Sequence, residues 1–237
     1  MKELMFNSHS LITPMSLSLY SICLPCLFLL CVVACNGSLE SPEERFWKWF
    51  RENSDHLMKL DLQQIDSNQQ YEKLYAELVE HIVAVHPDLS FEFSPPSDSS
   101  REFIITADGS RQAVPAVESL ASVAPQLKGW AIIPFIPRMD FIPAIGYGGL
   151  EINPDDVRFS LEHINGKMGI TFHIKGCQPD DDRYWAVAFL YATSILGERD
   201  VMLKSAFVEV DGKLSHDSRP ITELASVFDA AMMKAGQ

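Results

Sequence analysis

The segment VRFSLEHINGKMGITFHIK, residues 157–175, decides the fold of this chain. Apolar and polar side chains alternate on both sides of Asn165-Gly166, as in strands that are buried on one face. Asn-Gly supplies the positive φ angles that a two-residue hairpin turn requires. The segment therefore predicts a β-hairpin, in which His163 lies opposite Met168 and His173 lies opposite Arg158.

Elements on either side of this hairpin repeat one order. After it we expect a helix, a strand and a closing helix, at 183–196, 206–210 and 221–233. Before it we expect two strands, a helix, a strand and a long irregular segment, at 89–93, 102–107, 114–123, 130–136 and 137–156. The order β-β-α-β thus occurs twice, which predicts an α+β fold of two similar halves. We expect an antiparallel or mixed sheet with helices packed on one face.

Two helices precede the first half. Ser41-Pro42-Glu43-Glu44 has the residues of a helix start, with Ser as N-cap, Pro at the first position and Glu to close a capping box. Apolar residues of the FWKWF segment and beyond recur at helical spacing, which favours a core stripe over an exposed recognition surface. A second helix should begin near Asp66 or Ser67 and end before Pro87. Residues 41–86 are therefore a helical region within one α+β domain, 35–237.

The first 34 residues have the features of a targeting segment. LPCLFLLCVVACNG, residues 24–37, resembles a bacterial lipoprotein signal, in which small residues precede a cysteine that becomes the lipidated N-terminus. Two or three acyl chains on Cys35 would anchor the protein stably, whereas one chain alone binds marginally. Two alternatives stay open. They are an uncleaved anchor, although 17–34 is short for a membrane span, and a misassigned start on a cytosolic protein, because Lys2 and Glu3 cancel.

Composition restricts the classes of partner. The chain has 237 residues and a net charge of -13, to which residues 1–34 contribute nothing. An acidic surface repels phosphate backbones, so we expect no nucleic-acid partner, while a basic protein partner fits. Four of five cysteines lie at or before Cys35, which leaves Cys177 alone in the body. The cysteine count therefore predicts neither an intradomain disulfide nor a cysteine metal cluster.

The sequence contains no familiar catalytic motif. It has no GxGxxG, GxxxxGK[ST] or GxSxG pattern. The glycine-rich residues 146–149 lack a following helix that would aim amides at a phosphate, so we interpret them as an ordinary loop. Ser194 lies inside an apolar helix and is interpreted as a packing residue. Cys177 has no indicated histidine partner and is interpreted as a passive thiol.

Three groups of side chains have partial metal-ligand character. Glu77 and His81 are four residues apart on one helix, but such pairs are usually solvated surface. His163 and His173 lie on opposite faces of the predicted hairpin, so they cannot share a metal. The acidic runs 155–156 and 180–182 could hold Ca²⁺, but the second suits helix capping better. We expect no metal and no cofactor.

Five segments resemble an uncharacterised family of bacterial proteins to which no activity is attached. They are FWKWF at 46–50, DLSFEF at 88–93, REFIITADG at 101–109, APQLKGW at 124–130 and ILGE at 195–198. The resemblance extends from about Phe46 to Asp229 and carries over no catalytic residues. Members of similar appearance generally lack an N-terminal signal and look cytosolic, so the first 40 residues set this chain apart.

These observations favour a binding protein over an enzyme. We expect a lipid-anchored envelope protein that faces the periplasm or cell exterior and binds another protein or a peptide. The alternative is a hydrolase with a carboxylate or histidine site near 137–156, which a deep pocket lined by Asp155, Asp156, His163 or His173 would favour. A third possibility is a cytosolic domain with a misassigned start.

Overall fold

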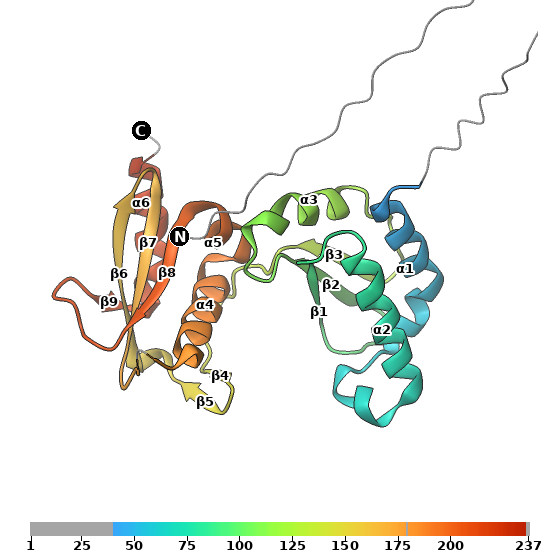
Figure 1. The fold of residues 1–237 in the computed structure, drawn as a ribbon, viewed down its shortest axis with the longest axis horizontal. Helices are drawn as coiled ribbons and strands as arrows, with labels where there is room; N and C mark the ends of the chain where they lie inside the picture. Colours follow the sequence, from blue (N-terminus) through green and yellow to red (C-terminus); the bar gives the residue numbers. More distant parts are fainter. Residues whose placement is uncertain (1–39, 179, 236–237) are drawn as a thin grey trace, which may run out of the picture. The chain divides into compact units, whose positions relative to one another are not determined.

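The computed structural model describes residues 40–178 and 180–235, which contain both helices and strands (Figure 1). The strands form three small sheets, with the orders β1-β2-β3, β4-β5 and β8-β7-β6-β9. The α+β fold class is thus confirmed, although each predicted half has a sheet of its own. The predicted signal segment 1–34 and Cys35 lie outside the described residues.

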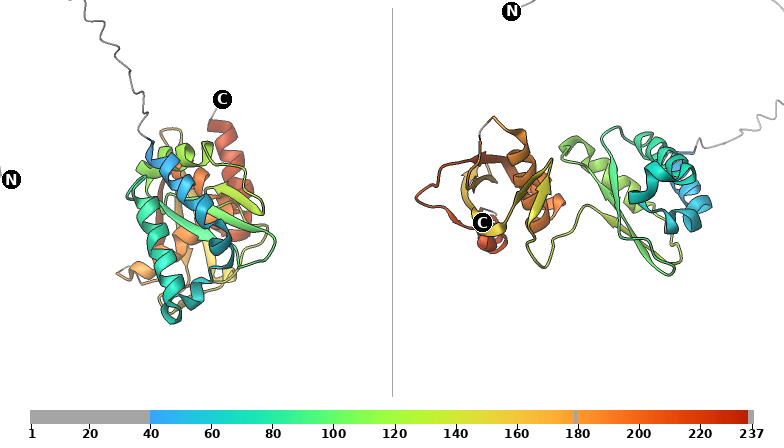
Figure 2. Two further views of the ribbon diagram at one scale, coloured as in Figure 1. Left: turned by 90° about the vertical axis from the view of Figure 1, so that its right-hand side faces the viewer. Right: turned by 90° about the horizontal axis from the view of Figure 1, so that it is seen from below.

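The N-terminal helical region begins at the predicted capping box. Helix α1 spans Pro42–Lys59, and the Ser41 and Glu44 side chains each bond the other's backbone N–H. Helix α2 spans Gln69–Val83 and starts later than expected because Asn68, not Ser67, is its N-cap. A 3-10 helix, Leu62–Ser67, fills the interval. Figure 2 shows α1 and α2 beside each other, over the sheet of the first half.

The α1 stripe is core, as expected, but of the two tryptophans in FWKWF it is Trp47 that is buried. Phe46, Trp47 and Phe50 are buried, whereas Trp49 is only half-buried and stacks on His81 at 4.7 Å. The Trp47 indole N–H donates to the carbonyl of Leu120 at 2.8 Å. That bond satisfies the one polar atom of a buried tryptophan.

The first half has the order β1, β2, α3, β3. Its elements are Ser90–Phe93, Arg101–Thr106, Val114–Ser122 and Trp130–Pro134. Strand β1 is antiparallel to β2, and α3 carries the chain back so that β3 lies parallel to β2. Strand β3 is therefore the outermost strand on one side of this sheet.

The second half repeats this arrangement. Its elements are β6 Val157–Ile164, β7 Lys167–Ile174, α4 Asp182–Leu196, α5 Glu198–Lys204 and β8 Ser205–Asp211. Strand β6 is antiparallel to β7, and β8 lies parallel to β7. The predicted register is confirmed, with His163 opposite Met168 and His173 opposite Arg158. Strand β9, Arg219–Pro220, pairs with β6, and helix α6, Leu224–Ala235, closes the chain.

The hairpin within residues 137–156 and helix α5 are among the elements that were not predicted. Residues 137–156 contain a small hairpin, β4 Ile145–Tyr147 and β5 Leu150–Ile152, which turns at Gly148-Gly149 with φ angles of 56° and 79°. Three-residue strands are too short to show an alternating pattern, and this hid them. Helix α5 follows Gly197, which was expected to end the helical segment before a strand. Gly197 does end α4, with φ 78°, but the chain re-enters a helix at once.

One buried carboxylate joins the two halves. Glu198 begins α5 and is only 1% exposed. It accepts hydrogen bonds from the Thr106 hydroxyl at 2.6 Å, the Ala107 N–H at 2.8 Å and the Ile136 N–H at 3.1 Å. These partners lie at the end of β2 and just after β3. A buried charge is tolerated when its lone pairs are satisfied in this way, so Glu198 fixes α5 against the first half.

Candidate functional site

A cleft of about 910 Å³ lies between β3 and the start of α5. We call it the β3 cleft. One wall comes from α3, the loop after it and β3 itself, and the other comes from 135–138 and the α4–α5 junction. Its lining includes Glu118, Leu127, Trp130, Ile132, Pro134, Arg138, Leu196 and Arg199. Helix, strand and loop thus enclose a space with apolar and charged groups together.

Residues of β3 line this cleft, and the outer edge of β3 pairs with no strand of the described residues. The Gly129 carbonyl accepts from the Arg101 N–H at 2.7 Å, and the Phe135 N–H donates to the Ile105 carbonyl at 2.8 Å. Along a strand, backbone groups alternate sides, so odd-numbered residues of β3 pair with β2. The N–H and C=O of Ile132, and the carbonyls of Trp130 and Pro134, therefore lie along the free edge.

A strained residue ends this edge. Phe135 is buried and has a φ of 65°, a left-handed conformation that is rare for a bulky side chain. Its N–H still bonds to β2, so the chain turns away from the strand direction directly after Pro134. Strain of this kind persists only where surrounding contacts hold it, and it often accompanies functional sites.

Ion pairs cross the β3 cleft and cover one end of it. Arg199 of α5 pairs with Glu118 of α3 at 3.0 Å, and both side chains are about half exposed. Arg138 donates to the Leu196 carbonyl at 2.7 Å and to the carboxylates of Asp229 and Asp200, each at 2.8 Å. Exposed pairs such as Glu118–Arg199 contribute roughly 0 to 1 kcal/mol, so a ligand can replace this one at little cost.

The charge states at Arg138 are firmly set. Its hydrogen bond to Asp229 is the main reason that the Arg138 pKa is raised, with Asp200 adding to the effect. The same bond lowers the pKa of Asp229 below its ordinary value. Arg138 is therefore a permanent cation that ties α6 and α5 to the segment following β3.

The corresponding edge of the second sheet is partly occupied by a side chain. The Trp185 indole N–H of α4 donates to the Val208 carbonyl of β8 at 3.0 Å. The Trp185 ring also stacks on Phe189, with centroids 5.4 Å apart. A side chain that bonds an outward carbonyl occupies an acceptor that a further strand would need. The outer strands β3 and β8 thus differ in how freely a further strand could pair with their outer edges.

The glycine-rich segment and Ser194 have structural roles. Gly148 and Gly149 form the turn of the β4–β5 hairpin, which agrees with their interpretation as a loop. Ser194 is half-buried in α4, and its carbonyl accepts from the Met139 N–H at 2.8 Å. The Cys177 thiol is half-buried, and burial is the main cause that raises its pKa, so it stays protonated at neutral pH. This protonation suits a passive thiol.

The structure separates most of the possible metal ligands. Glu77 pairs with Lys73 at 3.7 Å, while His81 stacks on Trp49. Asp181 caps α4 by accepting from the Arg183 N–H, as the capping interpretation predicts, and also pairs with the Arg183 guanidinium at 2.7 Å. Within 40–178 and 180–235, no group of three or more His, Cys, Asp or Glu side chains could hold a metal ion.

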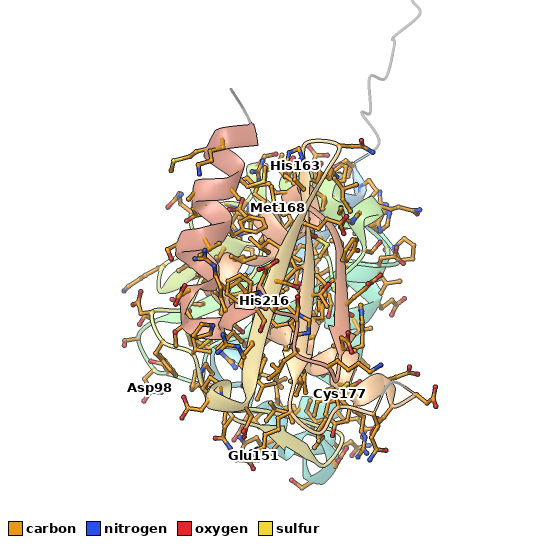
Figure 3. All side chains as sticks on the ribbon, turned by 90° about the vertical axis from the view of Figure 1, so that its left-hand side faces the viewer. Asp98, Glu151, His163, Met168, Cys177 and His216 are labelled. Carbon is orange, nitrogen blue, oxygen red and sulfur yellow. The ribbon has the colours of Figure 1, made fainter. Side chains whose placement is uncertain are left out.

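The residues named for a hydrolase site do not line the β3 cleft. Asp155 and Asp156 belong to a short 3-10 helix, and Asp156 pairs with Lys175 at 3.5 Å. His163 lies near the hairpin turn, beside Met168 (Figure 3). His173 is buried on the face of its sheet opposite to Phe172 and has polar partners that the sequence did not reveal.

Comparison of the chain with protein-family models, curated proteins and solved structures found no match. Inference about function therefore depends on the β3 cleft and on the other polar groups of the described residues.

Proposed function

We propose that this protein binds an extended, basic segment of another protein, which adds as a further strand to the outer edge of β3. The observation that carries the proposal is that β3 lines a large cleft, whereas the Trp185 indole bonds the Val208 carbonyl of β8. Strand addition supplies main-chain hydrogen bonds for affinity, and pockets for alternate side chains supply specificity.

The chemistry of the cleft suits this mode of binding. The Ile132 N–H would donate to a ligand carbonyl, and the Ile132 and Trp130 carbonyls would accept ligand N–H groups. Ligand side chains on one face would contact apolar residues such as Leu127 and Ile132, which are half-buried in the wall. Ligand side chains on the other face would reach the charged side chains of the cleft, such as Glu118 and Arg199.

The net charge of the chain favours a basic ligand, although the charged side chains of the cleft lining balance, with Glu118 and Asp200 against Arg138 and Arg199. The net charge of -13 belongs to the body of the chain and would attract a basic segment over long range. At the rim, Glu118 is held only by a half-exposed ion pair with Arg199. A lysine or arginine of the ligand can take the place of Arg199 at this carboxylate.

A proline substitution tests whether a ligand pairs with the outer edge of β3. Ile132→Pro removes the only outward N–H of β3 and leaves pairing with β2 intact. Val208→Pro, on the outer edge of β8, is the matched control. The probe is a displayed library of ten-residue peptides in which apolar positions alternate with Lys or Arg. Peptides that are selected for binding to the unchanged protein should protect the Ile132 N–H from hydrogen exchange. Their affinity should be at least tenfold lower for Ile132→Pro.

The outcome that contradicts strand addition is equally specific. Selected peptides that bind Ile132→Pro and the unchanged protein alike, or that protect amides elsewhere, would exclude the β3 edge. A loss of binding in Val208→Pro as large as in Ile132→Pro would indicate a general disturbance instead.

The proposed location is the cell envelope, through lipid on Cys35. No helix within the described residues is long and apolar enough to cross a bilayer. Detergent-phase partitioning and intact mass of the expressed protein test the anchor, with Cys35→Ala as the variant and Cys31→Ala as the matched control. We expect the unchanged protein and Cys31→Ala to lose residues 1–34 and to gain acyl mass. Cys35→Ala should do neither. An unlipidated, water-phase protein would remove the envelope from the proposal.

A further inference from the structure

A serine and a buried histidine form a hydrogen-bonded pair in the second sheet. Ser160 of β6 lies opposite Thr171 of β7. Thr171 and His173 are two residues apart on β7, so the side chains of Ser160 and His173 point to the same face of the sheet. The Ser160 Oγ is 3.0 Å from His173 Nε2. On the other side of the ring, His173 Nδ1 is 2.6 Å from the Lys213 carbonyl oxygen.

These contacts set the direction of both hydrogen bonds. A carbonyl oxygen can only accept, so Nδ1 carries the proton of the neutral ring and donates to Lys213. Nε2 is then left with a lone pair, to which the Ser160 hydroxyl donates. A serine bonded to a histidine that a third group orients is the arrangement by which a general base activates a nucleophile. His173 is only 4% exposed, which holds the ring in place.

Charged groups flank the histidine from both neighbouring strands. Arg158 of β6 and Asp211 of β8 each lie opposite His173 in the strand pairing. The guanidinium of Arg158 is committed to the hydroxyl and carbonyl of Ser218, and Asp211 accepts from the Lys213 N–H at 2.9 Å.

A cavity of about 490 Å³ adjoins Ser160. It is lined by the β6 residues 159–161, by the segment 216–219 and by Val227 of α6. Figure 3 looks onto this sheet and places His216 over the middle of its strands, far from His163. The cavity is large enough for a short acyl group with part of its leaving group.

A free backbone amide lies next to the serine. The Lys175 N–H donates to the Asp156 carbonyl at 3.0 Å, so even-numbered residues of β6 pair with β7. Leu161 therefore directs its N–H to the other side, where β9 pairs only with Arg158 and Phe159. This N–H borders the cavity and can donate to a developing oxyanion.

We propose that Ser160 is the nucleophile of an acyl-transfer site that takes small carboxylic esters, with His173 as its general base. Ser160 Oγ bonds to the acyl carbon while its proton passes to His173 Nε2. The ester C–O bond then breaks, and the leaving alkoxide takes that proton as an alcohol. Water attacks the acyl-serine in the same way, which releases the carboxylic acid and restores the hydroxyl. This activity is separate from strand addition at β3.

A fluorophosphonate probe tests the nucleophile directly. The folded protein should be labelled, with the adduct mapped by mass spectrometry to Ser160. Ser160→Ala should abolish the adduct, and His173→Gln should slow labelling at least tenfold. Ser67→Ala is the control, because this exposed serine of the N-terminal helical region lies outside the lining of the cavity and is expected to keep the full rate.

Two results would overturn the proposal. One is a folded protein that is not labelled at Ser160, and the other is an equal labelling rate in His173→Gln. If the histidine variant does not fold, a burst of p-nitrophenol from p-nitrophenyl acetate with the unchanged protein decides the matter, and its absence excludes the site. Peptide binding at β3 is measured on the same samples, so failure of one proposal leaves the other separately testable.

Discussion

The two halves of this protein share one topology but treat their outer strands in opposite ways. In each half an antiparallel hairpin is followed by a helix that returns the chain to a parallel third strand (Figure 1). In the second half Trp185 of α4 bonds to the Val208 carbonyl of β8. In the first half β3 lines a cleft, and its outer edge pairs with no strand of the described residues.

The returning helices explain the difference. Helix α3 has nine residues, VPAVESLAS, and none of its side chains is a long uncharged donor that could reach an outward carbonyl. Helix α4 has fifteen residues and carries an aromatic donor in its first turn. Edge strands are usually protected against pairing, and Pro134 limits β3 to one outward N–H, that of Ile132, so a paired ligand would centre on Ile132. The two halves share one topology, and we propose that the first half binds a ligand whereas the second has a structural role.

The largest expected effect comes from separating the halves at Glu198. Glu198→Ala leaves the Thr106 hydroxyl and the N–H groups of Ala107 and Ile136 without their buried partner. We expect the free energy of unfolding in denaturant to fall by about 3 kcal/mol or more. Glu118→Ala, which removes an exposed ion pair, should change it by less than about 1 kcal/mol. Equal effects of the two exchanges would show that Glu198 does not join the halves.

The next largest effect comes from freeing the edge of β8 that Trp185 contacts. Trp185→Ala removes the hydrogen bond to Val208 and the stacking on Phe189. We expect a loss of about 1 to 2 kcal/mol in unfolding free energy, together with concentration-dependent association through β8. Analytical ultracentrifugation measures the association, and Trp185→Phe separates the hydrogen bond from the ring. A monomeric Trp185→Ala would mean that the indole does not protect this edge.

A smaller effect is expected for the charge at the open edge. Glu118→Lys places a cation where we propose that a basic ligand binds. Affinity for the selected peptides should fall several-fold, mainly through slower association, and the difference should shrink at high salt. Unfolding free energy should change by less than about 1 kcal/mol, because the pair with Arg199 is half exposed. Unchanged association rates would count against an electrostatic contribution at this rim.

The smallest expected effect is a pH dependence at Asp229. Its pKa is lowered in the folded protein by the hydrogen bond from Arg138, so the stabilisation is complete above the unfolded value of 3.8. It should be lost as the pH falls through the lower folded value. Because the Asp229 side chain is 40% exposed, we expect less than about 1 kcal/mol. Asp229→Asn should remove this part of the acid sensitivity, and an identical pH profile for both proteins would contradict the assignment.

Local patterns predicted the elements that depend on local chemistry. Asn165 and Gly166 adopt the positive φ angles that the turn needs, and the hairpin register follows from them. Ser41 and Glu44 close their capping box within a few residues of sequence. The alternation of residues 157–175 determined which face of the second sheet is buried, and the repeated element order indicated two similar halves.

Tertiary contacts decided the rest. Gly197 marks the end of α4 in the sequence, but α5 begins there because Glu198 finds buried donors in β2 and after β3. His173 should be exposed by the strand pattern alone, yet the Lys213 carbonyl, forty residues away, fixes and buries it. The β3 cleft likewise combines residues near 118–138 with residues near 196–200. Sequence determines what each segment does with its neighbours along the chain, whereas burial and pairing between distant segments determine which groups become a site.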